Sequence, residues 1–295
     1  AFKRAARLAL SSVKNWIRPD GTGYIVKNKY PIEAEHGYER YSRHSCYNLL
    51  ACSMLAQAWQ FADDSIKEKP CPADIGGFTF AVPGFHKIFA NAGGTYIEYE
   101  TSGDHQYNPT GLIRIHLKHG HPQLGPSDGC ASVISGKEAN YTIGPAWKDD
   151  SGNWVKLADL NKPCEFKILQ ESPDMVKLKI MFKLSDSQNT LTELITVKQG
   201  EVIVEDKLSD TKTSQIRIYY PMLSFNGSER TEIQMDQKML TMKLENKSVS
   251  FKILNPGKTE LKHTGKTLKH RNGLVEPVYF DLDGQTARYR IFTGK

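Results

Sequence analysis

The sequence contains few cysteines and no long apolar run. Its five cysteines are odd in number and form no Cys-x-x-Cys pair, which disfavours a zinc ribbon and a disulfide scaffold. Free, mostly buried thiols are expected instead. No apolar stretch approaches the roughly 20 residues of a membrane helix, and we recognise no signal peptide. Because the first residue is Ala1, we expect a trimmed or partial chain, so the missing signal does not argue against secretion.

A strong charge imbalance is also absent. Lys and Arg number 39 against 33 Asp and Glu, a net charge of +6. This modest excess suits an acidic partner such as a uronic-acid polysaccharide or a nucleic acid. The excess alone does not choose between these two. The basic residues are scattered and form no dense block, which disfavours a nucleic acid, so no nucleic acid is expected, and the lack of a long apolar run leads us to expect no membrane partner.

Helical periodicity is confined to the first part of the chain. The stretch FKRAARLALSSVKNWI repeats apolar residues at helical spacing and predicts a helix over about 1–17. Proline and glycine in RPDGTG end this helix. After a partly extended connector, a second helix is predicted over about 38–62, and the region 1–66 is expected to be helical.

From residue 78 onward, apolar and polar residues alternate with a period of two. TELITVKQGEVIVEDKL and MVKLKIMFKL are examples, and turns such as DSGN, KQGE and NPGK separate these stretches. The pattern predicts an antiparallel β-sandwich over 78–295, solvated on one face of each sheet. A stretch rich in charge, Pro and Gly, 67–77, is the expected linker. The fold class is therefore α+β, with helices followed by a large antiparallel sandwich.

One face of the second helix is polar where it begins and apolar further along. Five side chains share this face at 100° per residue: Arg40, Tyr41, His44, Tyr47 and Asn48. The same face continues as Ala51, Met54 and Leu55. This change predicts a polar patch at the mouth of a buried surface, although two solvent-facing turns with packed tyrosines remain an alternative.

A second polar cluster lies between two glycines in the stretch GDHQYNPTG. It brings His105, Tyr107 and Asn108 into one inter-strand turn. The functional interpretation is that His105 faces the polar helix across a cleft. The alternative is an exposed turn whose residues stabilise their own loop.

These features resemble polysaccharide lyases that join an (α/α) toroid to an antiparallel β-sandwich. ERYSRHSCYNLLACSMLAQA is similar to the last inner helix of the toroid, and Arg40 precedes Tyr47 by seven residues, as an arginine precedes the catalytic tyrosine in the alginate-lyase branch. The GDHQ run, 103–106, resembles the heparinase II/III pattern Gly-Asp-His-Gln-His-Ala-Asp. TELITVKQGEVIVEDKL resembles the supersandwich of these enzymes. NAGGTYIEYETSGDHQYNPTGLIRIH together with the later PQLGPSDG is most similar to lyases that cut rhamnose–glucuronate linkages.

The resemblance implies the C-terminal helices of a toroid followed by a supersandwich, in a secreted or periplasmic lyase. Such an enzyme removes the C5 proton of a uronic acid and expels the C4 oxygen, which needs a base, an acid and a group that neutralises the carboxylate. The candidate catalytic residues are Tyr47, Tyr41, His44 and His105. The candidate substrate-binding residues are Arg40, Asn48, Tyr107, Asn108 and Arg114. Which group is base and which is acid stays open.

The sequence departs from the family at a structural zinc site. The second histidine of the family's run and an aspartate of a later turn help to hold that zinc, but Tyr107 replaces the histidine and Asp128 alone matches. His116, His119 and His121 lie nearby, yet His116 and His119 point to opposite faces if the strand runs on. We therefore expect no cofactor, with a structural zinc as the disfavoured alternative.

Two other functions remain open. A glycoside hydrolase needs two carboxylates flanking one bond, and Glu33, Glu35 and Glu39 crowd the connector without a second acid on the β side. A carbohydrate-binding module without activity is the other alternative, with Trp59, Trp147 and Trp154 as stacking residues. An unsaturated product distinguishes a lyase from both.

Overall fold

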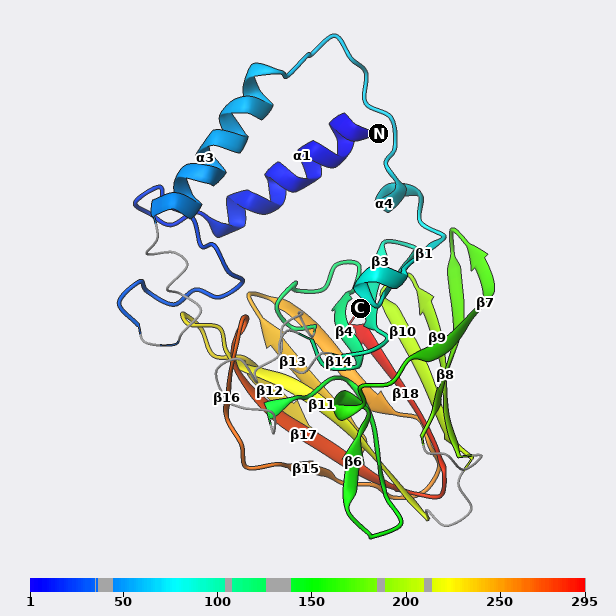
Figure 1. Cartoon of the computed structure of the whole chain (residues 1–295). Coiled ribbons are helices and arrows are strands. Elements are labelled where there is room, and N and C mark those ends of the chain that lie inside the picture. The colour runs from blue at the N-terminus through cyan, green and yellow to red at the C-terminus, as the bar shows by residue number, and fades with distance from the viewer. Residues whose placement is uncertain are drawn as a thin grey trace.

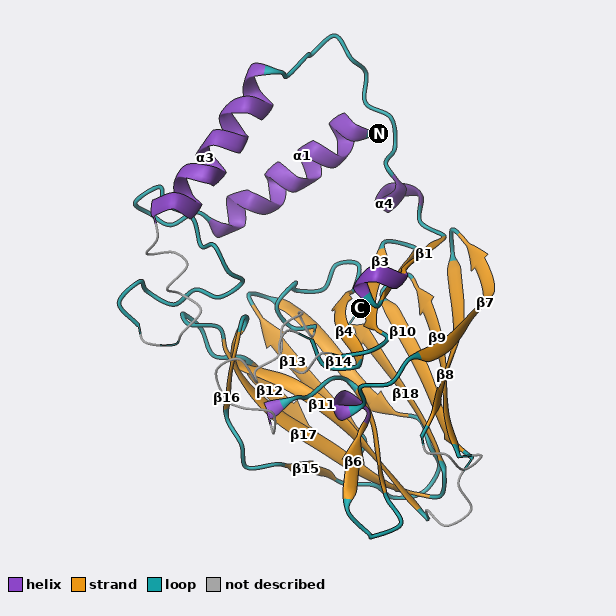
Figure 2. Ribbon diagram, viewed as in Figure 1, coloured by secondary structure: helices purple, strands orange, loops and turns teal. Residues whose placement is uncertain are grey.

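The computed structural model describes most of the chain and shows a few helices followed by antiparallel sheets (Figure 1). The described residues are 1–34, 36, 45–103, 108–125, 139–184, 189–209 and 214–294. Figure 2 shows the two long helices, α1 and α3, beyond one end of the strands and joined to them by irregular segments.

Two of the helices match the helical periodicity of the sequence. Helix α1 (Phe2–Val13) continues into a single 3-10 turn, η1 (Lys14–Trp16), before the proline and glycine that were predicted to end it. Helix α3 (Ser45–Gln60) is described from Ser45 onward, within the predicted 38–62 helix. A short helix, α4 (Pro72–Ile75), lies in the expected linker.

The strands form three sheets, and every described pair of strands is antiparallel, as predicted. The eight-stranded sheet has the order β12 (Glu232–Met235), β13 (Met239–Leu244), β14 (Lys247–Ile253), β18 (Thr286–Thr293), β10 (Glu201–Leu208), β9 (Thr190–Lys198), β8 (Met175–Lys183), β7 (Cys164–Ser172). The six-stranded sheet comprises β15 (Leu261–His263), β17 (Gly273–Asp283), β11 (Gln215–Phe225), β5 (Gly144–Lys148), β6 (Trp154–Lys156) and, beside β17, β16 (Leu268–His270). The four-stranded sheet has the order β1 (Phe78–Val82), β2 (Lys87–Ala92), β3 (Thr95–Glu100), β4 (Gly111–His116).

The two smaller sheets cover one face of the eight-stranded sheet. Strands β2 and β3 contact β8 and β9, while β11 contacts β18. Aromatic rings mark both contacts: Tyr99 lies 6.5 Å from Phe182, and Tyr220 lies 5.0 Å from Phe251. Side chains from all three sheets form one apolar core, because alternate residues of each strand point inward. The arrangement is a β-sandwich.

Two carboxyl groups interrupt this apolar core. Glu193 of β9 and Asp206 of β10 are partners in the strand ladder, and both are fully buried. The Tyr99 hydroxyl donates to Oε2 of Glu193. Burial raises the pKa of Glu193 to about 7 and that of Asp206 well above its ordinary value, in the second case with help from the Glu193 charge.

The α-helices α1, α3 and α4, in contrast, bury no residue. Helix α3 is apolar on most of its surface, yet its side chains remain exposed: Leu49 by 66%, Met54 by 61% and Trp59 by 82%. A helix that is hydrophobic all round normally lies inside a larger assembly. The described part of the chain therefore does not supply the cover that α3 requires. No helix in that part has both the length and the apolarity to cross a membrane.

Helix α1 is attached to the segment after α3 through its basic residues. Lys3 donates through Nζ to the Asp63 carbonyl at 2.6 Å, and Arg4 forms an ion pair with Asp74 at 3.0 Å. Arg7 approaches Glu68 at 2.7 Å. These contacts are polar and largely exposed, so they orient α1 without providing a core.

The expectation of mostly buried thiols is wrong for helix α3. Cys46 and Cys52 are exposed, Cys71 is buried and Cys164 is half-buried. The two exposed thiols lie on the helix whose faces have no cover, which explains the difference. These four cysteines are free thiols.

Candidate functional site

Buried side-chain amides fix the connector between α1 and α3 to one end of the sandwich. Asn28 donates through Nδ2 to the Arg271 carbonyl at 2.9 Å. Gln123 donates through Nε2 to the Lys27 carbonyl at 2.8 Å. Asn226 donates through Nδ2 to Oε1 of Gln123 at 3.1 Å. Buried amides need such partners, and the connector is therefore held against the turns that follow β4 and β11 and precede β17.

Aromatic rings extend this attachment to His36. The His36 ring stacks on Tyr30, with centroids 4.2 Å apart, and Tyr30 meets Phe225 edge-on at 5.6 Å. Nε2 of His36 lies 2.8 Å from the His270 carbonyl and donates to it, since a carbonyl only accepts. His36 is buried, so we assign it a structural role.

A pocket opens beside these contacts, where the helical region meets the sandwich. It encloses about 460 Å³, part of it open to solvent. The lining comes from η1, the connector, the segment after β4 and the β13–β14 hairpin, and includes Trp16, Lys29, His121, Gln123, Glu245 and Lys247. We call this hollow the junction pocket. Only the fold brings these segments together, because they are far apart in the sequence.

His121 is the most buried titratable side chain of the junction pocket, with 8% exposure. The backbone N–H of Gln123 donates to Nδ1 at 3.3 Å, so the proton of the neutral ring lies on Nε2. Nε2 donates to Oε2 of Glu245 at 3.2 Å. Burial lowers the pKa of His121, against the opposing effect of Glu245. The ring is therefore neutral near pH 7.

Glu245 is held at the tip of the β13–β14 hairpin. Glu245 and Asn246 have φ angles of 47° and 63°, the left-handed conformation that a tight hairpin turn requires. Lys29 forms an ion pair with Glu245 and, through this hydrogen bond, lowers the pKa of the carboxyl group. The turn thus presents a charged acceptor to the pocket.

The junction pocket combines excess positive charge with an aromatic wall. Lys29 and Lys247 face one charged glutamate, Glu245, and a neutral histidine. Lys247 makes no ion pair with any residue in the described ranges. Trp16 is half-buried and supplies an apolar surface. Such a site can hold an anionic group, a hydroxyl group and an apolar ring face together, which an acidic sugar unit offers.

Two of the predicted site residues, Tyr47 and Asn48, lie near the N-terminal end of α3. Oδ1 of Asn48 accepts the backbone N–H of Gly23 at 2.8 Å. A Cβ atom placed on Gly23 would lie 3.4 Å from that oxygen and 3.9 Å from the Trp16 carbonyl oxygen. Tyr47 is 38% exposed. The end of the helix that carries the predicted tyrosine therefore lies near the backbone of Gly23 and Trp16.

Arg114 and Asn108 do not line the junction pocket. Arg114 of β4 pairs with the buried carboxylate of Glu98 at 3.1 Å, which also accepts from Lys87 at 2.5 Å. Asn108 belongs to the segment that precedes β4. The remaining candidates lie outside the described residues, and their roles stay predictions: Arg40, Tyr41, His44, His105 and Tyr107.

Sequence reasoning did not single out the lining of the junction pocket. His121 entered only as a disfavoured zinc ligand, and Trp16 only as part of a helix face. One local signal exists, because Glu245 and Asn246 stand between two alternating stretches and indicate a tight turn. The contact between Lys29 and this turn depends on the buried amides that hold the connector. No pattern in the neighbouring sequence indicates it.

No metal site is evident in the part of the chain that the structure describes. No group of three or more His, Cys, Asp or Glu side chains lies together there in a way that could hold an ion. His121 is bonded to Glu245, while Tyr107 and Asp128 lie outside the described residues.

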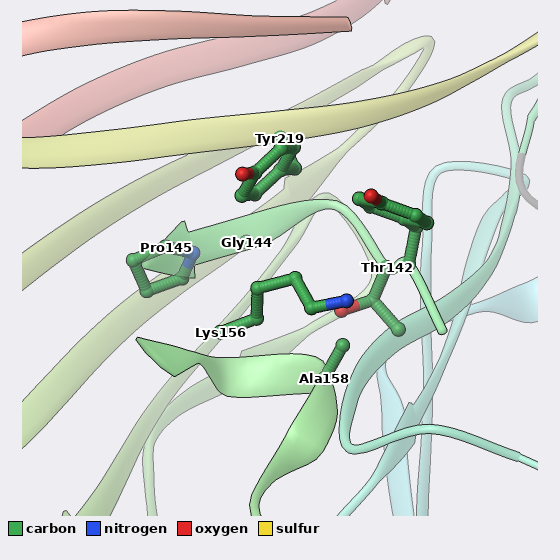
Figure 3. A pocket seen from close by; sticks show the side chains of 7 residues that line it. Thr142, Gly144, Pro145, Lys156, Ala158 and Tyr219 are labelled. Carbon is green, nitrogen blue, oxygen red and sulfur yellow. The ribbon is translucent and has the colours of Figure 1, made fainter. Parts of the chain in front are cut away.

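A second hollow lies on the six-stranded sheet, but a lysine fills it. Figure 3 shows the Lys156 side chain extending toward Thr142. Its ammonium group lies 4.2 Å from the Tyr141 ring centroid and donates to the Asn140 carbonyl at 2.9 Å. Tyr219 packs against Tyr141 at 5.2 Å. With about 150 Å³ in total, this hollow is too narrow for a sugar unit, and we assign it a structural role.

The three tryptophans considered for sugar stacking have different surroundings. Trp147 is buried in the core, and Trp154 stacks on the Arg217 guanidinium at 4.1 Å. Trp59 is exposed on α3. They form no common platform, whereas Trp16 adjoins charged and polar groups.

Comparison with known proteins supports the fold. No family model and no curated protein matches the sequence. Among solved structures, heparan sulfate lyase HepC from Pedobacter heparinus is similar, with 10% sequence identity and a TM-score of 0.54. A mutant of that enzyme has 11% identity and a TM-score of 0.56. Each likeness covers 96% of this chain and 46% of the other, so the chain spans less than half the length of those structures. The architecture is thus like that of a polysaccharide lyase.

Proposed function

We propose that this chain is part of a polysaccharide lyase that cleaves a uronic-acid-containing glycan by β-elimination. The observation that carries the proposal is the likeness to a heparan sulfate lyase across 96% of the chain, which includes both the helices and the sandwich. The junction pocket lies where these regions meet, and its excess of positive charge suits an acidic glycan.

The proposed reaction needs three groups around one uronic-acid unit. A base takes the C5 proton, the electrons of that C–H bond form the C4–C5 double bond, and the C4–O bond breaks. An acid gives a proton to the departing oxygen. Negative charge grows on the carboxylate during this step, and a donor or cation must stabilise it.

Tyr47 and Asn48 are the described residues to which we assign roles in this reaction. The Tyr47 hydroxyl serves as acid or base, with Tyr41 as the alternative. A free tyrosine has a pKa of about 10, so the role of base requires a nearby cation, for which Arg40 is the candidate. Asn48 is the proposed carboxylate donor. Its bond to the backbone of Gly23 supports this role, because it fixes the side chain.

A histidine is the proposed partner of the tyrosine. His44 and His105 are the candidates, since an unperturbed imidazole titrates near pH 6.5 and can accept or give a proton at neutral pH. Tyr107, Asn108 and Arg114 complete the proposed substrate-binding set.

We further propose that α1 and α3 belong to an (α/α) toroid. The support is the exposure of α3, which is apolar on most of its surface but buries no residue. Burial of its exposed leucines, methionine and tryptophan against further helices would contribute about 25 cal/mol per Å².

The proposed substrate is a rhamnose–glucuronate polymer, on the resemblance of the segment that precedes β4. Because such polymers lie outside cells, we propose a secreted or periplasmic enzyme. The test is incubation of the protein with a rhamnose–glucuronate glycan, alginate and heparan sulfate, followed by ultraviolet absorbance and mass spectrometry. A lyase produces an absorbing unsaturated end that lacks one water relative to a hydrolysis product. Reducing ends without absorbance indicate a hydrolase, and binding without cleavage indicates a carbohydrate-binding module.

A further inference from the structure

We infer that the junction pocket is a subsite for one acidic sugar unit of the glycan. The anionic group of this unit, a carboxylate or a sulfate, lies at Lys247, and its ring lies against Trp16. Glu245 accepts a hydrogen bond from a sugar hydroxyl. The inference names the ligand class of the junction pocket and rests on the proposed function only in taking an acidic glycan as the natural ligand.

The walls of the pocket are held in place before a ligand arrives. Gln123 is 1% exposed and uses both ends of its amide, with the Lys27 carbonyl and with Asn226. Its backbone N–H donates to His121 at 3.3 Å. Gln123 is therefore a positioning residue, and little conformational entropy is lost when a ligand binds walls fixed in this way.

The hydrogen bonds of His121 decide what the pocket can offer. Because Nδ1 accepts from Gln123, Nε2 is the donor, and Glu245 already receives it at 3.2 Å. The carboxylate of Glu245 also receives Lys29. Glu245 thus holds both His121 and Lys29 in place, and its negative charge cancels the positive charge of Lys29. The Glu245 carboxylate can still accept a hydrogen bond from a sugar hydroxyl.

Lys247 is the cation that remains for an anionic ligand. It is exposed, follows the left-handed turn and makes no ion pair with a residue in the described ranges. A lysine in this state binds a carboxylate or sulfate with little desolvation, because part of its water shell is retained. Since Lys29 is neutralised by Glu245, the net charge available to the ligand is positive.

Because of Trp16, the proposed subsite is formed by residues of both the helical region and the sandwich. Trp16 belongs to η1, whereas His121 and Lys247 belong to the sandwich. A sugar ring presents an apolar face, and a half-buried indole offers a rigid surface for it. A bound unit therefore contacts the helical region and the sandwich at the same time, beside the end of α3 that carries Tyr47.

The experiment is titration calorimetry of the 295-residue chain with three tetrasaccharides: unsulfated and glucuronate-containing, sulfated and glucuronate-containing, and neutral. We expect Lys247→Met to weaken binding of an acidic tetrasaccharide about tenfold, the effect of one charged hydrogen bond. Lys183→Met is the matched control, since Lys183 is 77% exposed on a strand remote from the pocket, and it should leave affinity within about twofold. Dependence of the unsulfated ligand on Lys247 identifies the carboxylate, and dependence of the sulfated ligand alone identifies the sulfate.

Trp16→Leu supplies an independent reading, because loss of the aromatic wall should weaken acidic and neutral ligands alike. Equal losses from Lys247→Met and Lys183→Met, or equal affinity for the neutral ligand, would overturn the inference. Failure of the proposed function looks different: specific, Lys247-dependent binding without any unsaturated product refutes the lyase and keeps the subsite. An unsaturated product whose formation has the same KM in Lys247→Met refutes the subsite and keeps the lyase.

Discussion

At the scale of single residues, the core contains a carboxyl pair that must hold a proton. Glu193 and Asp206 face each other across the β9–β10 ladder without exposure to solvent. Tyr99, Tyr289, Cys164 and Glu205 are the other titratable groups that influence the pair, and none carries positive charge. Two adjacent carboxylates without a cation cannot both be ionised at low cost.

This pair predicts that stability falls as pH rises. Burial raises the folded pKa of Glu193 from 4.5 to about 7. Its contribution is fully present below the unfolded pKa and is lost as pH rises through the folded pKa. The loss is roughly 3 kcal/mol at about 1.4 kcal/mol per pKa unit. Urea unfolding at pH 5 and pH 8 measures it, and Glu193→Gln should reduce the difference because an amide does not ionise.

Glu232→Gln is the control, since the Glu232 side chain is 69% exposed and should leave the pH dependence unchanged. Equal pH dependence in Glu193→Gln and the native chain would contradict the account. The sequence carried the signal for this pair: in TLTELITVK, Glu193 occupies an inward position between Leu191 and Ile195. The alternation predicted the strand correctly, and a glutamate at an inward position of that strand indicates a buried carboxyl group.

At the scale of elements, hydrophobic periodicity predicted the individual helices and strands, which depend on residues close together in the sequence. Helix α1, the described part of α3 and the first strand at Phe78 agree with the expected ranges, because the spacing of apolar residues has the period of a helix or of a strand. The return of the connector to the sandwich was not predictable. It depends on hydrogen bonds such as that from Gln123 to Lys27, which lie 96 residues apart.

The buried amides predict that the connector loosens when one of them is removed. Gln123→Leu leaves the Lys27 carbonyl and the Asn226 amide without their partner, at a cost of about 1–3 kcal/mol. The backbone N–H of Lys29, which donates to the Asn226 carbonyl at 2.7 Å, should then exchange faster with solvent. Hydrogen exchange with mass spectrometry measures this change.

Asn153→Ala is the matched control, because Asn153 is an exposed turn residue between β5 and β6. It should leave exchange at the connector unaltered. Unchanged exchange in Gln123→Leu would show that the amides do not hold the connector.

At the scale of the whole molecule, the chain combines a complete core with an uncovered helix. The sandwich buries side chains from three sheets, whereas α3 buries none. The chain spans 46% of the length of the heparan sulfate lyase structure to which it is similar. The sequence indicated the helix but could not show whether its partners belong to this chain, because periodicity does not identify what covers an apolar face.

The uncovered helix predicts self-association of the isolated chain. Leu50 and Met54 are 52% and 61% exposed one turn apart on α3, and large apolar patches drive association. Sedimentation velocity at increasing concentration should show dimers or larger species. Leu50→Lys with Met54→Lys should restore the monomer without unfolding the sandwich. Ser53→Lys adds charge without removing apolar surface and should have a weaker effect. A native chain that stays monomeric throughout contradicts the proposed need for cover.

The central claim is the elimination reaction, and initial-rate ultraviolet absorbance of tyrosine variants tests it most directly. The assay uses the glycan that gives an unsaturated product. If the protein has further helices, the full-length enzyme is used. Tyr47→Phe or Tyr41→Phe should lower kcat by about 10²–10⁴-fold, because one of these hydroxyls transfers the proton. Tyr279→Phe, in β17 of the six-stranded sheet beside Arg217, should retain full activity and rules out a general effect of the substitution. Full activity in both the Tyr47→Phe and the Tyr41→Phe variants, or no unsaturated product from any uronic-acid polymer, would contradict the account.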